Sequence, residues 1–373
     1  MRITPFAVEQ WMNEFETQCQ YNLAETCVAS LTIAELADLA GVRDTLLAQI
    51  LPLRMTYGPI EGSDRLRAAV ASLYARQAAR NVLITHGAVG ANALVYQALV
   101  GPGDVVVSIV PTYQQHYSIP ESIGAEVRQL RLRAESGYLP DVSELRRMVT
   151  PKTRLISLTN PNNPTGSLMD RSCLEEVVAI ADAVGAYILS DEVYRGTNQS
   201  GDEFTPSVAD MYDRGISTGS VSKAFSLAGL RLGWIVGPGD VLRAAEVHRD
   251  YNTISVGMID DLMASIALES HPRILARSRG IVRGNLAILD QWIETEPAIS
   301  YIKPQAGTVS LLKYAFDIPS REFCLKLLRA TGVLFTPGSA FDFEGFVRIG
   351  YANSRDILAK GLEETTRFLR TLG

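Results

Sequence analysis

The middle of the chain alternates between two patterns of apolar residues. Between about residues 64 and 236, amphipathic helical stretches, the first at 64–79, are separated by short and almost wholly apolar runs. These runs end in turn residues and are NVLITHG, GPGDVVVSIVPTY, RLISLTNP, AYILSDEVY, GISTGSVSK and RLGWIVG. Such runs indicate strands that are covered on both faces, and strands that alternate with helices pair in parallel. The pattern therefore predicts an α/β fold with a mostly parallel sheet flanked by helices.

The alternation stops after Gly237. Residues 240–269 are charged and amphipathic and predict one or two long helices, and residues 273–294 predict another. Strand-like stretches follow at YIKPQAGTVSLLKY and FVRIGY, and a last helix is expected after Asn353. This change predicts a smaller α+β domain at the C-terminus. We expect three parts. Residues 1–45 form an N-terminal segment that joins the small domain, residues 46–265 form a large domain, and residues 266–373 form the small C-terminal domain.

The composition excludes several classes of protein. The chain has 373 residues, of which 47% are hydrophobic and 20% are charged, so it is neither disordered nor fibrous. Its net charge of −6 and the lack of any block of like charges give no sign of a nucleic-acid or membrane partner. The longest apolar stretches are far shorter than the ~20 residues of a membrane span. The N-terminus meets acidic residues too early for a signal peptide, so we expect a cytoplasmic protein.

Several common chemistries have no motif in this chain. No GxGxxG follows a strand and no GxxxxGK is present, which disfavours a Rossmann dinucleotide site and a P-loop. The four cysteines contain no CxxC pair and the four histidines no HExxH array. We therefore expect no metal site and no disulfide framework.

The strongest local signal is SVSKAFSLAGLRLGW at residues 220–234. Lys223 follows a predicted strand within an apolar segment, where a lysine can lose its proton and attack an aldehyde. Ser220, Ser222 and Arg231 are donors that suit a phosphate monoester. A solvated loop lysine with an interdomain arginine is the alternative that this segment alone leaves open.

Two further signals follow predicted strands. In YILSDEVYRG, Asp191 ends an apolar strand at the edge where open α/β sheets bind ligands, and Tyr194 is three residues away. A buried carboxylate needs a cationic partner, for which a protonated pyridine nitrogen would serve. The alternative is a helix N-cap aspartate with a tyrosine in the core. NPNNPTG at 160–166 forms a rigid loop from which Asn163 can project, or is a bare turn.

Two weaker signals concern anions. THGAVGANA places Gly87, Ala88 and Val89 at a strand-to-helix junction, where backbone N–H groups can face an anion. FVRIGYA places Arg348 within a strand, where its guanidinium can bind a carboxylate in a bidentate manner. A salt bridge on an edge strand explains Arg348 equally well when it is taken alone.

In this order and at these intervals, the segments resemble the class I/II aminotransferase family, the fold-type-I enzymes that use pyridoxal 5′-phosphate. The resemblance runs from about Tyr57 to Arg348. It implies a fold of the aspartate-aminotransferase type with pyridoxal 5′-phosphate as the cofactor.

The resemblance also implies a role for each motif. Lys223 matches the lysine that forms a Schiff base with the cofactor and later moves a proton between the substrate Cα and the cofactor. Asp191 matches the carboxylate that keeps the pyridine nitrogen protonated, so that the ring withdraws electrons. Asn163 and Tyr194 match the residues that hydrogen-bond to the ring oxygen, and Tyr113 in PTYQQH matches the aromatic residue stacked on the ring.

The phosphate and the substrate have matching residues too. The positions that match the phosphate site are Gly87, Ala88, Val89, Ser220, Ser222 and Arg231. Arg348 matches the arginine that binds the substrate α-carboxylate, with Asn163 beside it. Tyr57 in MTYGPIEG resembles the tyrosine that reaches the phosphate of the neighbouring subunit, which implies a homodimer.

Two departures from the family pattern are visible. Val89 stands where relatives often carry a hydroxyl, so one phosphate contact is in doubt. Near the N-terminus, many relatives have a glycine-rich strand, whereas this chain has YNLAETCVASLTIAEL. That stretch resembles the branch that contains capreomycidine synthase.

The resemblance predicts an aminotransferase that moves an amino group between an L-amino acid and a 2-oxo acid. The alternative is a lyase or cyclase with the same cofactor, acting by β or γ elimination or by a cyclisation of the capreomycidine kind. Which bond breaks depends on orientation, which the sequence does not show. A cofactor-binding sensor with an additional DNA-binding domain is disfavoured. The resemblance to aminotransferases already covers residues 57–348, which leaves too few residues for such a domain.

Overall fold

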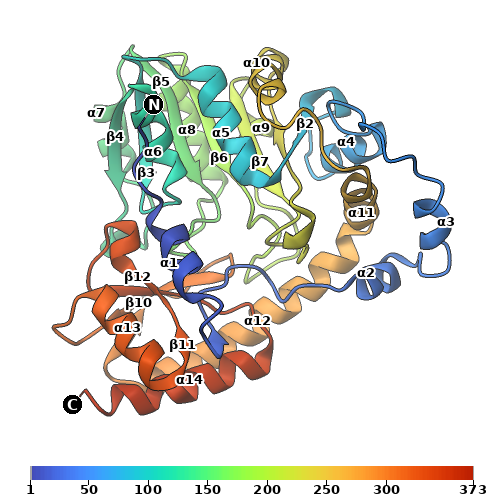
Figure 1. Ribbon diagram of the computed structural model, residues 1–373. Coiled ribbons are helices and arrows are strands. Elements are labelled where there is room, and N and C mark those ends of the chain that lie inside the picture. The colour runs from blue at the N-terminus through green and yellow to red at the C-terminus, as the bar shows by residue number, and fades with distance from the viewer. Residues whose placement is uncertain (1, 373) are drawn as a thin grey trace.

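The centre of the molecule is a seven-stranded sheet. A computed structural model of the chain describes residues 2–372 (Figure 1). The strands, in their order across the sheet, are β2 (Val82–Thr85), β8 (Gly233–Val236), β7 (Gly215–Ser220), β6 (Tyr187–Asp191), β5 (Thr153–Thr159), β3 (Val105–Val110) and β4 (Glu126–Arg131). Only β8 runs antiparallel, to both β2 and β7. The predicted mostly parallel sheet is therefore confirmed.

Helices cover both faces of this sheet, which explains why its strands are so apolar. One face packs against α5 (Gly87–Leu99) and α10 (Gly239–Asp250). The other face packs against α7 (Val142–Met148) and α8 (Arg171–Asp182). Every residue of β2, β3, β6, β7 and β8 is buried. The remaining helices of this layer are α4 (Asp64–Ala71), α6 (Gln115–Ile123), α9 (Val208–Met211) and α11 (Met258–Glu269).

Two details differ from the sequence prediction. The helix expected over 64–79 ends at Ala71, because the chain turns so that the N–H groups of Ala75 and Arg76 donate to the Asp210 carboxylate, each at 2.9 Å. Strand β4 was not predicted. It lies at the edge of the sheet and is mostly half-buried, so its sequence EVRQLR lacks the apolar pattern of the inner strands.

The C-terminal part forms a second layer. Its four-stranded sheet has the order β12 (Thr336–Pro337), β13 (Phe346–Gly350), β10 (Val309–Tyr314) and β9 (Ile299–Tyr301). A separate parallel pair joins β1 (Tyr21–Asn22) to β11 (Val333–Leu334). The helices are α12 (His271–Thr295), α13 (Ser320–Thr331) and α14 (Arg355–Leu369). The smaller α+β layer is thus present where the pattern changed.

The N-terminal residues divide between the two layers. Trp11, Leu23 and Val28 are buried in the core of the C-terminal layer. By contrast, α2 (Ile33–Ala40) and α3 (Leu46–Ile50) contribute to the core that also contains α4 and α11. We keep the division at residues 1–45, 46–265 and 266–373 as a proposal; on this packing, α2 would be counted with the large domain. No helix within residues 2–372 is long and apolar enough to cross a membrane.

Helix α1 (Ala7–Phe15) connects the layers across the edge at which the parallel strands end (Figure 1). The Ala7 N–H donates to Gln114 Oε1 at 2.8 Å on the large layer. The Trp11 indole N–H donates to the Phe335 carbonyl at 2.9 Å on the small layer. On the large sheet, Thr159 pairs with Asp191, and Asp191 pairs with Thr218. The carboxyl ends of β5, β6 and β7 therefore lie side by side beneath α1.

A close backbone contact at Gly233 holds the start of α5 in place. A Cβ on Gly233 would lie 2.3 Å from the Gly87 carbonyl carbon and 2.5 Å from the Ala88 nitrogen. We expect Gly233→Ala to lower the free energy of unfolding by about 2–3 kcal/mol, because backbone atoms have to move. Gly229→Ala is the matched control, since its Cβ would meet nothing within 4 Å. Thermal unfolding of both variants tests this, and equal midpoints would contradict it.

Candidate active site

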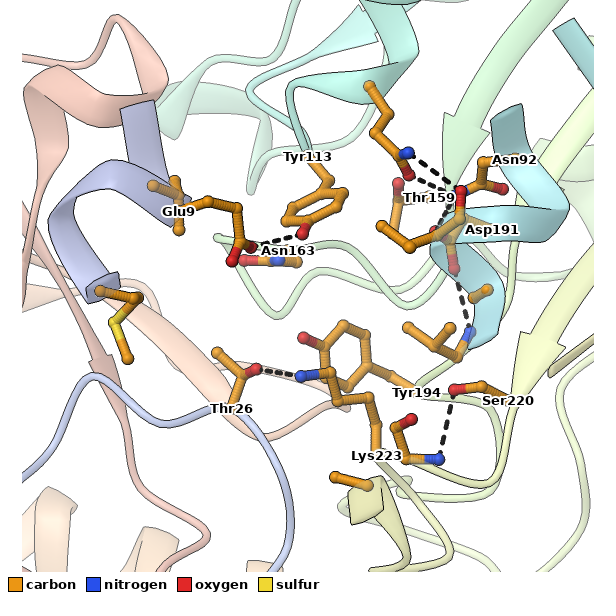
Figure 2. A pocket seen from close by; sticks show the side chains of 18 of the residues that line it. Glu9, Thr26, Asn92, Tyr113, Thr159, Asn163, Asp191, Tyr194, Ser220 and Lys223 are labelled. Carbon is orange, nitrogen blue, oxygen red and sulfur yellow. Dashed lines mark hydrogen bonds between the residues drawn. The ribbon is translucent and has the colours of Figure 1, made fainter. Parts of the chain in front are cut away.

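A cavity of about 520 Å³ lies at the carboxyl ends of β5, β6 and β7. Helix α1, the start of α5 and strand β13 supply its other walls. Eleven residues predicted from the sequence line it: Ala88, Val89, Tyr113, Asn163, Asp191, Tyr194, Ser220, Ser222, Lys223, Arg231 and Arg348. Gly87 lies directly before Ala88, whereas Tyr57 does not line the cavity. Figure 2 shows the side chains around the space.

Lys223 projects into the cavity from the loop after β7. Its Nζ donates to Thr26 Oγ1 at 2.6 Å (Figure 2). The same Nζ lies 3.6 Å from Cys27 Sγ. Burial disfavours the charged lysine, but the acidic groups of Cys27, Tyr194 and Glu25 outweigh burial and raise its pKa. The expected apolar surroundings are therefore wrong. The sequence neighbours of Lys223 are apolar, but its spatial neighbours are polar and come from residues 25–27.

Asp191 is a buried carboxylate with no lysine or arginine partner among the described residues. It is 5% exposed at the end of β6. Its Oδ2 accepts from Asn92 Nδ2 at 2.8 Å, and its Oδ1 accepts from the Val193 N–H at 3.2 Å. Within residues 2–372, no lysine or arginine makes a salt bridge with it; the nearest basic group is His116 Nε2 at 3.6 Å. A carboxylate in this setting favours a ligand that brings its own positive charge.

Asn92 and His116 are parts of the site that the sequence analysis missed. Asn92 Oδ1 accepts from the Thr218 hydroxyl at 2.6 Å, which aims its amide at Asp191. Nδ1 of His116 lies 2.9 Å from the Tyr96 hydroxyl and 2.8 Å from the Ser157 hydroxyl. Asn92 could have been found, because it follows Ala88 by one helical turn on α5.

Tyr113, Asn163 and Tyr194 surround the centre of the cavity (Figure 2). The Tyr113 hydroxyl donates to Glu9 at 2.5 Å, and its ring centre lies 4.5 Å from that of Phe6. Burial, followed by the charge of Glu9, raises the pKa of Tyr113. Burial also raises the pKa of Tyr194, against the opposing charges of Lys223 and Arg348. Both phenols therefore stay protonated at neutral pH.

The start of α5 and the loop after β7 form a corner that is suited to an anion. The first turn of this 13-residue helix has no side-chain cap, so its N–H groups are free to bind an anion. A Cβ on Gly87 would lie 3.1 Å from Arg231 Nη2, which places the guanidinium beside this turn. Ser220, at the end of β7, and Ser222 line the same cavity.

Arg348 enters the cavity from β13 and is 2% exposed. Nη1 donates to Asn163 Oδ1 at 3.2 Å, and Nη2 donates to the Ala24 carbonyl at 3.0 Å. Its Nε is buried and has no hydrogen-bond partner among the described residues. Burial lowers the pKa of Arg348, although a guanidinium keeps its charge. An unpartnered donor on a buried cation is suited to a carboxylate ligand.

A model of the class I and II aminotransferase family matches residues 32–362. The chain belongs to this family. The match covers most of the residues that build the cavity, and it confirms the family that the sequence motifs predicted.

Two curated relatives illustrate the range of this aminotransferase family. Capreomycidine synthase of Streptomyces vinaceus is 31% identical over 369 residues, which cover 98% of this chain and 93% of that protein. The aspartate/prephenate aminotransferase of Thermus thermophilus is 28% identical over 326 residues, covering 85% of this chain and 83% of that protein.

Two solved structures are similar over the whole chain. A PLP-dependent aminotransferase from Streptococcus suis has a TM-score of 0.97 and 45% identity, and the match covers 100% of this chain and 99% of that one. A PLP-dependent cyclase has a TM-score of 0.93 and 28% identity, with the same coverage. These matches confirm the predicted fold.

The cofactor of this aminotransferase family member is pyridoxal 5′-phosphate, and the cavity fits it on three observations. Asp191 has no lysine or arginine partner, only the His116 imidazole at 3.6 Å, which suits a protonated ring nitrogen. The uncapped start of α5 beside Arg231 suits the phosphate. Lys223 is the only lysine among the lining residues, which suits the aldehyde of the cofactor.

Proposed function

We propose that this chain is an aminotransferase that moves an amino group between an L-amino acid and a 2-oxo acid. The observation that carries the proposal is that one cavity holds both the Lys223 amine and the buried, partly unpartnered guanidinium of Arg348. The Lys223 amine can move a proton at the substrate Cα only if another group holds the substrate in position. Arg348 is placed to hold the substrate carboxylate. The similarity to aminotransferases over most of the chain supports this proposal.

The proposed roles follow the positions of the side chains. When bound, pyridoxal 5′-phosphate withdraws electrons from the substrate Cα and so loosens its bonds. Lys223 Nζ holds the cofactor and, after release, carries the proton taken from Cα. Asp191 holds a proton on the ring nitrogen, and Asn92 and Val193 fix the orientation of its carboxylate. Asn163 and Tyr194 bind the ring oxygen, and Tyr113 covers one face of the ring.

The remaining residues bind the two anionic ends. We propose that Ser220, Ser222 and Arg231 bind the phosphate together with the N–H groups of Gly87, Ala88 and Val89. Arg348, which is already bonded to Asn163, binds the substrate carboxylate. Helix α1 covers the cavity and limits the access of water to it.

A measurement of products tests this proposal. The cofactor-loaded protein is mixed with a panel of L-amino acids, and the loss of visible absorbance of the bound cofactor is followed together with the 2-oxo acid and ammonia released. A stoichiometric 2-oxo acid without ammonia is expected. Ammonia or a cyclic product in its place would contradict transamination.

The alternative is a lyase or cyclase with the same cofactor. It is favoured by the similarity to capreomycidine synthase and to the solved cyclase, both of which match nearly the whole chain. In that case the product measurement yields ammonia or a cyclised amino acid, because a different bond is broken at the same site.

We propose that the active enzyme is a homodimer in which Tyr57 reaches the neighbouring site. Tyr57 is 76% exposed and lies outside its own cavity. The same segment exposes further large apolar side chains, namely Leu47, Leu51, Met55 and Ile60. Such a patch favours burial against a second copy of the chain.

Tyr57→Phe tests this geometry. We expect the variant to stay dimeric but to lose the cofactor several-fold faster on dialysis, because one hydroxyl donor to the phosphate is removed. Tyr21→Phe, in the C-terminal layer and away from the patch, is the matched control. A monomer with full activity would exclude the proposed arrangement.

A further inference from the structure

Thr26 lines the cavity, and the proposed function gives its side chain no task. It lies in the loop after β1 and is 8% exposed. Its hydroxyl oxygen accepts a hydrogen bond from Lys223 Nζ at 2.6 Å, and the two side chains point toward each other (Figure 2). Within residues 2–372, the other hydrogen-bond partner of this amine is Cys27 Sγ at 3.6 Å. Thr26 therefore provides the closest contact of the amine.

The backbone of Thr26 is held from two sides. Its N–H donates to Glu25 Oε1 at 2.7 Å, and its carbonyl accepts from the Thr308 hydroxyl at 2.6 Å. Thr308 is fully buried directly before β10. Two residues after Thr26, the Val28 N–H donates to the Lys223 carbonyl at 3.4 Å. The hydroxyl therefore meets the Lys223 amine from a backbone that is fixed on the small layer and on the loop after β7.

A fixed acceptor gives the Lys223 amine a direction. An uncharged amine has two N–H groups and one lone pair. Thr26 Oγ1 is a strong acceptor for one N–H group, and Cys27 Sγ is a weak acceptor for the other. With both N–H groups engaged, the lone pair is the part of the amine that is free to react. Without the hydroxyl, the amine turns about its Cε–Nζ bond and the lone pair has no fixed direction.

The lone pair is the part of Lys223 that the proposed reaction uses. The C–H bond at the substrate Cα breaks, its proton is bound by the lone pair of Nζ, and its electron pair stays on the substrate side. Thr26 Oγ1 keeps its hydrogen bond throughout and neither gives nor takes a proton. Because the amine becomes a charged ammonium group, the same hydrogen bond becomes stronger as the proton arrives.

We infer that Thr26 is a positioning residue of the reaction. Its hydroxyl directs the Lys223 amine toward the proton at Cα and stabilises the charge that the amine gains. This inference rests on the proposed function for the role of Lys223. It adds a residue of the N-terminal segment to the groups that control proton transfer.

The reactivity of the Lys223 amine tests the contact without turnover. The protein is loaded with pyridoxamine 5′-phosphate, which has no aldehyde to occupy the amine, and is treated with cyanate at mildly alkaline pH. Cyanate reacts with uncharged amines, and mass spectrometry follows the carbamoylation of Lys223. The exposed Lys152 in the same digest is the internal reference.

Thr26→Val keeps the shape of the side chain but removes the acceptor that favours the ammonium form of Lys223. We therefore expect Lys223 to be carbamoylated at least about threefold faster in this variant than in the native protein. Thr26→Ser keeps the hydroxyl and should react at the native rate. Equal rates in Thr26→Val and the native protein would overturn the inference.

Turnover of an amino acid with deuterium at Cα tests the effect on proton transfer. We expect Thr26→Val to lower kcat by about tenfold to a hundredfold, to change KM by less than about threefold and to raise the isotope effect on kcat, because a misdirected amine slows the transfer itself. Thr26→Ser should recover most of kcat. A merely structural role would leave the isotope effect unchanged.

Thr365→Val is the matched control, because it removes a buried hydroxyl that bonds to the Gly361 carbonyl within α14. It should change neither the carbamoylation rate nor the isotope effect. If carbamoylation changes as expected but no amino acid is converted, the proposed function is wrong and only the contact with Lys223 stands. If amino acids are converted while Thr26→Val keeps the native kcat and isotope effect, the proposed function stands and Thr26 has no part in proton transfer.

Discussion

Replacing Lys223 with alanine is expected to lower turnover by at least about 10³-fold, because the group that moves the proton at the substrate Cα is lost. Lys223 is the only lysine that lines the cavity, so no other amine is placed to take over. The phosphate corner is untouched, and we therefore expect the variant still to bind the cofactor. Treatment with borohydride followed by mass spectrometry should fix the cofactor to the native protein and not to the variant.

A control separates this effect from a loss of structure. Lys152→Ala removes an exposed lysine far from the cavity and should leave both turnover and the borohydride product unchanged. Circular dichroism should show that Lys223→Ala is folded, since the side chain loses only its contacts with Thr26 and Cys27. A Lys223→Ala protein that still yields the reduced adduct would refute the role of this lysine.

The residues at the strand ends could be predicted because their position follows from a general property of parallel sheets. Asp191 ends β6 and Ser220 ends β7, so each apolar run marks the point at which a side chain enters the site. Arg348 lies within β13 rather than at its end, and it was found from the alternation of apolar and polar residues in that strand. In each case the local sequence carries the information.

The contribution of Glu9 to the cavity could not be predicted, because nothing local indicates it. Glu9 reaches the cavity only through α1, which is bonded to a residue 104 positions away in the chain. Thr26 and Cys27 approach Lys223 across nearly 200 residues. The sequence analysis therefore placed Lys223 among apolar neighbours, where a lysine loses its proton more easily, whereas the distant polar neighbours raise its pKa.

The fold shows the same division between local and distant causes. The inner strands were predicted because both of their faces are buried, whereas the edge strand β4 was missed because it is only partly covered. The end of α4 depends on Asp210, about 135 residues away, which binds the chain after Ala71. Helix propensity alone would predict that the helix continues past Ala71.

Replacing Asp191 with asparagine is expected to preserve cofactor binding and to lower turnover by about 10²–10³-fold. Asparagine keeps the size of the side chain but removes the negative charge that favours a protonated ring nitrogen. A neutral ring withdraws electrons less strongly from the substrate Cα, so the proton there is harder to remove. The measurement is kcat together with the pH dependence of the visible absorbance of the bound cofactor.

Asn92→Ala separates the charge of Asp191 from its orientation. That change removes the amide donor at 2.8 Å but keeps the carboxylate itself, so its loss of turnover should be clearly smaller than that of Asp191→Asn. Asp182→Asn removes an exposed carboxylate at the end of α8 and should have no effect. If Asp191→Asn turned over as fast as the native protein, the ring nitrogen would not depend on this charge. The burial of a carboxylate without a lysine or arginine partner at the end of β6 would then need another explanation.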